Sequence, residues 1–156
     1  MRFVTFDANG QERLGAVDAK RGILDLKKAS AALPGDMIAL IEGGDAALAE
    51  AKKVFSAASD KGDWLPFAGT KLYAPIPRPR KNIFCIGRNY KLHIEEAARA
   101  LNIPFKYPPV PEIFSKPFTT VIGPDANVKR HAKNTEKLDY EVELAVVIGK
   151  MALDVT

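Results

Sequence analysis

The chain has 156 residues, of which 47% are hydrophobic and 27% charged, a composition ordinary for a soluble globular protein. Its formal net charge of +4 is a mild basic bias. The basic residues are scattered among acids and form no patch, so we expect no binding to nucleic acid. No apolar run approaches the ~20 residues that a membrane-spanning helix needs, so we expect no membrane partner either.

Cys85 is the single cysteine, so the chain cannot form an internal disulfide. It lies in the apolar run "NIFCIG", where we expect a buried small hydrophobic side chain more than a reactive nucleophile. The amino terminus has no apolar signal core. These features fit a reducing compartment, and we expect the protein in the cytoplasm.

Short apolar strands are predicted near the amino terminus, at residues 2–6, 13–17 and 22–26. Asn9 and Gly10 lie between the first two of these strands. This dipeptide is a strong signal for a two-residue hairpin turn, so we expect the first two strands to pair.

Residues 36–59 show helical periodicity that is interrupted at Gly43 and Gly44. We expect two helices there, the second of them capped by Asp45. No set of potential ligands stands out in this part of the chain. We therefore predict a small accessory α+β domain over residues 1–72.

A proline-rich linker is predicted at residues 73–81, because alternating prolines favour extended backbone. A second domain then begins at residue 82. We expect it to contain a buried strand at 82–87, a helix after Gly87, a proline-studded loop that ends in strands, and a last strand within 140–155.

Two acids in the last predicted strand, Glu141 and Glu143, are two positions apart and would share one face. Adjacent carboxylates repel each other unless water or a cation separates them. Oxygen ligands favour hard ions such as Mg²⁺, Mn²⁺ or Ca²⁺ over Zn²⁺. The alternative is a solvated strand face, but the apolar "LAVVIG" that follows is typical of a strand buried on both faces.

His93 and Glu96 are three positions apart in the predicted helix, so they would share one flank. A carboxylate beside an imidazole fixes its tautomer and supports a general base. The alternative is a surface histidine with an ordinary helical neighbour. Lys116 is a second open case, because a lysine in the apolar "IFSKPF" either keeps its amine in solvent or faces an anion in a pocket. For His131, among polar loop residues, we expect no role.

Four segments together resemble the fumarylacetoacetate hydrolase (FAH) family. "FCIGRNYKLHIEEA" resembles the family's glycine-x-asparagine-tyrosine segment with its following histidine and glutamate, and "PEIFSKPFTTVIGP" resembles its phenylalanine-x-lysine-proline segment. "LDYEVELAVVIGK" is similar to the most specific motif of the family. The early strands resemble the accessory domain of its bacterial members, so the resemblance covers essentially the whole chain.

The resemblance implies an α+β fold, mostly β, in which the accessory domain precedes part of a mixed β-sandwich roll. It implies that Glu141 and Glu143 are metal ligands for Mg²⁺ or Mn²⁺, with Ca²⁺ as a substitute in crystals. His93 and Glu96 would be the catalytic dyad on a lid helix, and Tyr90 and Lys116 would line the substrate pocket. A homodimer is implied as well.

The implied activity is metal-dependent chemistry on small 2-oxo acids through an enolate, often in aromatic catabolism. We expect C–C hydrolysis of acylpyruvate or fumarylacetoacetate type. The alternatives are a decarboxylase or isomerase of the 2-hydroxymuconate or oxaloacetate type, or a catalytically incomplete fragment. The fragment alternative arises because the family's third metal ligand, an aspartate, lies further along than Thr156, so residues 82–156 resemble only the first part of a catalytic domain.

Overall fold

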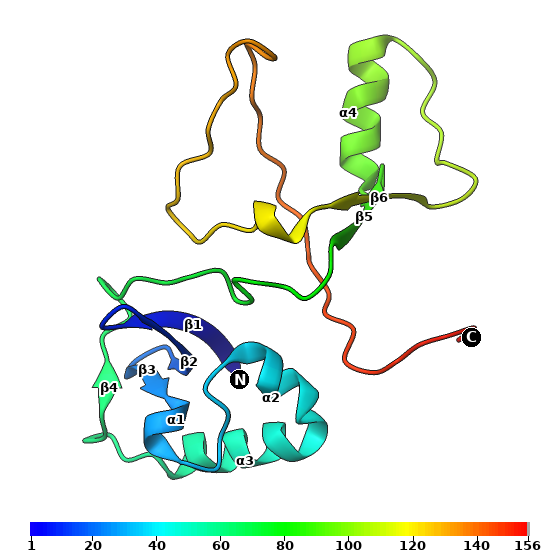
Figure 1. Cartoon of the computed structure of the whole chain (residues 1–156). Coiled ribbons are helices and arrows are strands. Elements are labelled where there is room, and N and C mark those ends of the chain that lie inside the picture. The colour runs from blue at the N-terminus through cyan, green and yellow to red at the C-terminus, as the bar shows by residue number, and fades with distance from the viewer. Residues whose placement is uncertain (156) are drawn as a thin grey trace. The chain divides into compact units, whose positions relative to one another are not determined.

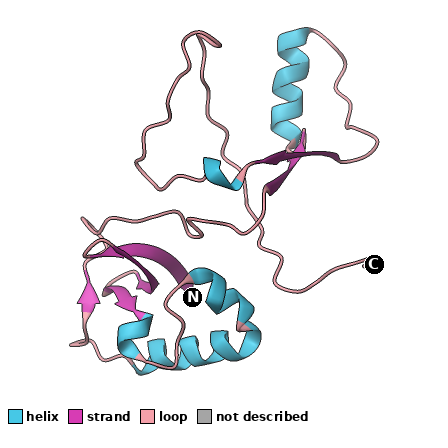
Figure 2. Cartoon of the chain, viewed as in Figure 1, coloured by secondary structure: helices cyan, strands magenta, loops and turns pink. Residues whose placement is uncertain are grey.

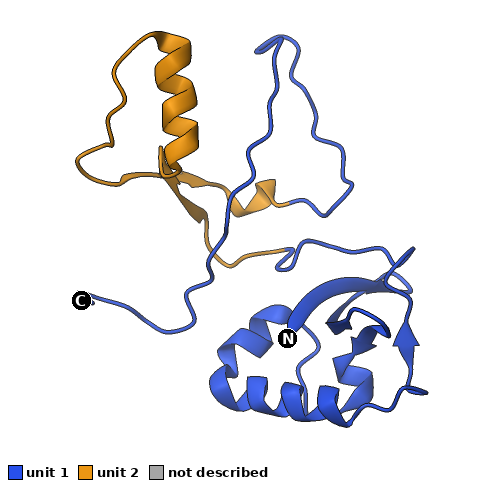
Figure 3. Ribbon diagram, turned by 180° about the vertical axis from the view of Figure 1, so that it is seen from behind, with its two compact units in different colours: residues 1–77, 122–156 blue, residues 78–121 orange. Residues whose placement is uncertain are grey.

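The protein is described from a computed structural model, in which residues 1–155 are placed (Figure 1). The chain divides into two compact units, each described by itself (Figure 3). Unit 1 contains residues 1–77 and the residues from 122 onward, and unit 2 contains residues 78–121. The elements are helices and strands in mixed order, so the fold class is α+β as predicted (Figure 2).

Unit 1 is built on a four-stranded antiparallel sheet in the order β1-β2-β3-β4. The strands are β1 (Arg2–Ala8), β2 (Gln11–Asp18), β3 (Gly22–Asp25) and β4 (Trp64–Leu65). The predicted hairpin between β1 and β2 is confirmed. Its turn residues Asn9 and Gly10 have φ of 57° and 84°, the left-handed backbone that this dipeptide tolerates.

Three helices follow β3: α1 (Leu26–Ala29), α2 (Met37–Glu42) and α3 (Gly44–Ala57). Asp36 caps α2 through its side chain, which accepts a hydrogen bond from the Ala39 amide at 2.9 Å. The predicted Asp45 cap of α3 is wrong. Gly43 is the cap residue because Gly44 accepts a left-handed φ of 56° and lets α3 begin directly after α2, which leaves Asp45 inside the first turn.

The core of unit 1 lies between the sheet and these helices. In β2, Leu14 and Ala16 are fully buried two positions apart, so one face of the strand points at the helices. The buried cluster consists of Leu14, Ala16, Leu24, Leu26, Leu33, Leu40 and Ala51. This apolar contact explains why helices as short as α1 and α2 persist, since packing rather than propensity stabilises short helices.

The opposite face of the sheet buries Phe6 beside Gly15. A Cβ atom added to Gly15 would lie 2.4 Å from the Ile23 Cγ2 methyl and 3.1 Å from the Phe6 ring, so a larger residue would force these side chains to shift. Residues 71–75 run along the free edge of β1, where the Tyr73 amide donates to the Thr5 carbonyl at 2.9 Å. The first residues of the proline-rich stretch are therefore held by the sheet.

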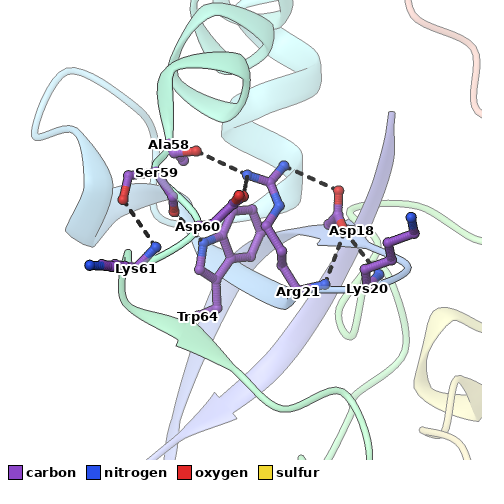
Figure 4. Close-up of polar contacts among 8 residues, drawn as sticks. All are labelled: Asp18, Lys20, Arg21, Ala58, Ser59, Asp60, Lys61 and Trp64. Atoms are coloured by element: carbon purple, nitrogen blue, oxygen red, sulfur yellow. Dashed lines mark hydrogen bonds and ion pairs between the residues drawn. The ribbon is translucent and has the colours of Figure 1, made fainter.

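Arg21 joins the turn between β2 and β3 to the segment after α3 (Figure 4). Its guanidinium donates to the Ala58 carbonyl at 2.9 Å and pairs with Asp18 at 3.1 Å. It also lies 4.2 Å from the centroid of the Trp64 ring, a cation–π contact. Trp64 in turn donates from its indole nitrogen to the Ser59 carbonyl at 2.9 Å, so one arginine connects two loops that are about 40 residues apart.

This cluster predicts an acid-sensitive contribution to stability. The Asp18 carboxylate accepts hydrogen bonds from the Arg21 and Lys20 amides and from the Arg21 side chain, which lowers its pKa from 3.8 to about 2. Because the pKa is depressed in the folded state, this stabilisation is complete above pH 3.8 and is lost as the pH falls toward 2. We expect the urea midpoint of Asp18→Asn, followed by Trp64 fluorescence, to depend less on pH in this window than that of the parent. Parallel pH profiles would contradict this.

Unit 2 contains an antiparallel two-stranded ribbon, β5 (Ile83–Gly87) with β6 (Glu112–Lys116), and the helix α4 (Lys91–Leu101) between them in sequence. A short 3₁₀ turn, η1 (Phe118–Thr120), follows β6. The predicted strand and helix are confirmed, but the predicted burial of the strand is not. Phe84 is 73% exposed and Cys85 half-buried, because within the described residues no third strand pairs with this ribbon.

Residues 122–155 contain no helix or strand in the structure, which corrects the predicted last strand (Figure 2). Val142 is 87% exposed there. A strand requires a hydrogen-bonded neighbour, and no described residue pairs with this segment in a β-ladder. None of the helices in the described part of the chain has the length and apolar content of a membrane span.

Candidate functional site

The amino-terminal end of α4 carries two predicted site residues, Tyr90 and His93. Tyr90 is the cap residue in extended backbone, and no side-chain hydrogen bond caps the helix there. The first helical hydrogen bond runs from the Ile94 amide to the Tyr90 carbonyl at 3.1 Å. Tyr90 is 41% exposed, and His93 lies on the first turn, also exposed.

The two flanks of α4 differ in burial. Ile94 and Ala98 are buried and lie one turn apart, whereas His93 and Glu96 are exposed. Their separation of three positions places His93 and Glu96 on one flank of the helix. Glu95 points to another flank, where its carboxylate lies 3.7 Å from the ammonium of Lys91. The helix therefore leaves Glu96 as the carboxylate on the side of His93, as predicted.

Lys116 lies at the far end of the ribbon from this turn. It pairs with Ile83, whereas Glu112 pairs with Gly87, the residue that leads into α4. The two pairs are separated by roughly 13 Å of strand, from ~3.3 Å per residue. The Lys116 ammonium lies 5.9 Å from the centroid of the Phe114 ring. The ribbon itself therefore does not bring Lys116 to the Tyr90 end, and its role in a pocket stays a prediction.

Arg88 is a residue that the sequence analysis did not single out. It follows β5 directly, has a left-handed φ of 49°, and forms a two-point ion pair with Glu112, with Nε 2.7 Å from Oε2 and Nη2 in contact with Oε1. Their hydrogen bond and charges raise the pKa of Arg88 and hold the pKa of Glu112 below its usual range. The arginine inside "GRNY" could have been noted from the sequence. Its partner lies 24 positions away, and no local pattern in the sequence indicates that the two residues pair.

Glu141 and Glu143 are both exposed in an irregular segment. Without a strand, their spacing no longer requires the two carboxylates to share a face, which corrects that part of the metal prediction. Among the described residues, no three His, Cys, Asp or Glu side chains gather closely enough to hold one ion. The sequence analysis placed only two ligands of such a centre within this chain, so the assignment of Glu141 and Glu143 to Mg²⁺ or Mn²⁺ stays a prediction.

A cavity of about 400 Å³ in unit 2 lies at the carboxyl-terminal end of α4, lined by Arg99, Asn102 and Phe105 among others. In unit 1, a cavity of about 700 Å³ runs along residues 67–73 and 123–126. Neither contains a predicted site residue. The candidate site is therefore the exposed amino-terminal end of α4, and neither of these two cavities forms part of it.

Comparison with known proteins gives a consistent result. A family model described as fumarylacetoacetate (FAA) hydrolase C-terminal matches residues 82–156. The chain is 38% identical to "Oxaloacetate tautomerase YisK" of Bacillus subtilis (strain 168), over 96% of this chain and 52% of that protein. It is 36% identical to "Oxaloacetate tautomerase FAHD2A, mitochondrial" of Homo sapiens, over 83% of this chain and 38% of that protein.

A solved structure, "Fumarylacetoacetate hydrolase (EaFAH) from psychrophilic Exiguobacterium antarcticum", has a similar fold. It superposes with a TM-score of 0.55 at 24% sequence identity, over 89% of this chain and 43% of that chain. The present chain spans about half the length, or less, of the curated relatives it matches.

Proposed function

Because this chain belongs to the fumarylacetoacetate hydrolase family, we propose that it functions in interconverting the keto and enol forms of small 2-oxo acids such as oxaloacetate. The observation that carries the proposal is the 38% identity, over 96% of the chain, to a protein named oxaloacetate tautomerase. The sequence analysis favoured C–C hydrolysis, but the relatives' names support its isomerase alternative better. The small 2-oxo acid is thus the proposed partner, and a homodimer remains a proposal.

Tautomerisation moves one proton and needs no covalent intermediate. In the enol-to-keto direction the C2 hydroxyl loses a proton and C3 gains one, while the double bond moves from C2–C3 to C2–O. An imidazole suits both transfers, because it gives and takes protons near neutral pH. His93, exposed on the first turn of α4, would carry the proton, and Glu96 on the same flank would orient its ring.

The anionic groups of the substrate require positive or hydrogen-bonding partners. We assign the Tyr90 hydroxyl, at the same helix end as His93, to one of them. We propose Lys116 as a second partner, for a substrate carboxylate. It pairs with Ile83 at the other end of the ribbon, so the ribbon alone does not bring it to Tyr90. The Mg²⁺ or Mn²⁺ implied by the family stays a prediction, and no step is assigned to it because the described carboxylates do not form a centre.

The test is a direct comparison of reactions with the purified chain. The ultraviolet absorbance of enol-oxaloacetate falls as it converts to the keto form, and we expect the chain to accelerate this decay. Pyruvate release is measured in parallel from oxaloacetate and from an acylpyruvate. Decay at the uncatalysed rate would overturn the proposal, and acylpyruvate cleavage without tautomerisation would return the function to C–C hydrolysis.

A further inference from the structure

The turn between β5 and α4 holds a side chain in a conformation that normally favours glycine. Arg88 has φ of 49°, although the residue before it is Gly87. Left-handed backbone is unfavourable for a residue with a Cβ atom, and such residues persist where surrounding contacts fix them. We therefore expect a contact of the arginine side chain to offset the energetic cost of this backbone conformation.

That contact is the ion pair with Glu112. The guanidinium meets the carboxylate through two nitrogens, Nε at 2.7 Å from Oε2 and Nη2 on Oε1. Two-point pairing fixes direction as well as distance. Glu112 is the register partner of Gly87, so the pair joins the turn to the neighbouring strand immediately beside the last rung of the ribbon.

The start of α4 depends on this turn. No side-chain hydrogen bond caps the helix at Tyr90, and the first helical backbone bond runs from the Ile94 amide to the Tyr90 carbonyl. A helix without a cap frays at its first turn. Two residues separate Arg88 from the first residue of α4, so a fixed Arg88 limits the directions in which the helix can leave the ribbon.

We infer that Arg88 is a positioning residue whose ion pair with Glu112 fixes the first turn of α4 and so the placement of Tyr90 and His93. The structural half of this inference stands on contacts within unit 2. Its catalytic half rests on the proposed function, because it assumes that His93 transfers the proton. The two halves are measured separately.

The structural half is tested by hydrogen exchange of the backbone amides of residues 94–97, the first that donate within α4, in the full chain. We expect Arg88→Ala and Glu112→Ala each to speed this exchange about two- to fivefold, the range of an exposed ion pair. Exchange in β1 and β2 serves as the internal reference and stays unchanged. Arg99→Ala, in the last turn of the same helix, is the control for loss of one exposed arginine.

Two further variants separate the ion pair from the backbone. Arg88→Gly relieves the left-handed conformation but lacks the guanidinium, so we expect the same faster exchange as in Arg88→Ala. The reversed pair Arg88→Glu with Glu112→Arg should restore slow exchange. Parental exchange in Arg88→Gly, or no rescue by the reversed pair, would overturn the inference.

The influence of Arg88 on catalysis is tested by measuring kcat and KM with enol-oxaloacetate. We expect Arg88→Ala to lower kcat with KM nearly unchanged, and the reversed pair to recover kcat. An unchanged kcat in a variant with faster exchange would leave Arg88 without influence on the reaction and overturn this half. If the parent chain shows no tautomerisation, the proposed function fails, while hydrogen exchange still decides the structural half.

Discussion

Replacing His93 by alanine is expected to slow tautomerisation of oxaloacetate by about 10²- to 10⁴-fold, the usual contribution of a positioned general base or acid. The histidine is exposed on the first turn of α4, with its neighbours Ile94 and Ala98 supplying the buried side of the helix. Its replacement therefore removes no core contact, and the loss should appear in activity rather than in stability. The measurement is the decay rate of enol absorbance at saturating substrate.

The chain supplies a matched control, because it has two histidines. His131 lies in an exposed polar loop outside unit 2, and His131→Ala should keep the parental rate. A second variant, Glu96→Gln, should lower the rate less than His93→Ala, since it removes only the charge that orients the ring. Equal rates for His93→Ala and the parent would remove His93 from the mechanism.

Replacing Phe6 by alanine is expected to destabilise unit 1 by about 3–5 kcal/mol, the usual cost of deleting a buried phenylalanine ring. Phe6 is fully buried, so deleting its ring leaves a cavity on this face of the sheet. Since domains are stable by only about 5–15 kcal/mol, this variant should be close to unfolding. Trp64, the single tryptophan, lies in unit 1 and reports its urea midpoint.

Phe84→Ala is the control for this prediction. The same chemical change is made at a side chain that is 73% exposed in β5 of unit 2, outside the sheet that Trp64 reports. The free energy of unfolding of unit 1 should therefore change by less than ~0.5 kcal/mol. A Phe6→Ala midpoint equal to that of Phe84→Ala would show that the face of the sheet carrying Phe6 contributes little to the fold.

Local signals in the sequence predicted the elements that depend on nearby residues. Asn9 and Gly10 tolerate left-handed backbone, and the turn formed there. Alanines and leucines at helical spacing predicted the helix, and the three-position spacing of His93 and Glu96 predicted their shared flank. The cap of α3 was missed, because Gly44 offered an earlier start than the acid that follows it.

The segment with Glu141 and Glu143 shows the limit of such signals. Its alternation of apolar and acidic residues predicts a strand, but a strand exists only when another backbone accepts its hydrogen bonds, and no described residue does so. The motif that contains these acids, "LDYEVELAVVIGK", resembles that of the family, which the comparisons support. Family resemblance is thus a property of the residues themselves, whereas the predicted strand also requires a pairing partner, which the described residues do not provide.

By itself, the sequence determined the family, the hairpin, the helix α4 and the flank shared by His93 and Glu96, because each of these depends on residue types within a few positions of one another. The tertiary structure alone decided how unit 2 is held together at its turn. Arg88 and Glu112 are 24 positions apart, and they meet because β5 and β6 pair with Gly87 opposite Glu112. The strand register therefore selects the arginine's partner, and that register is set by hydrogen bonds between distant segments.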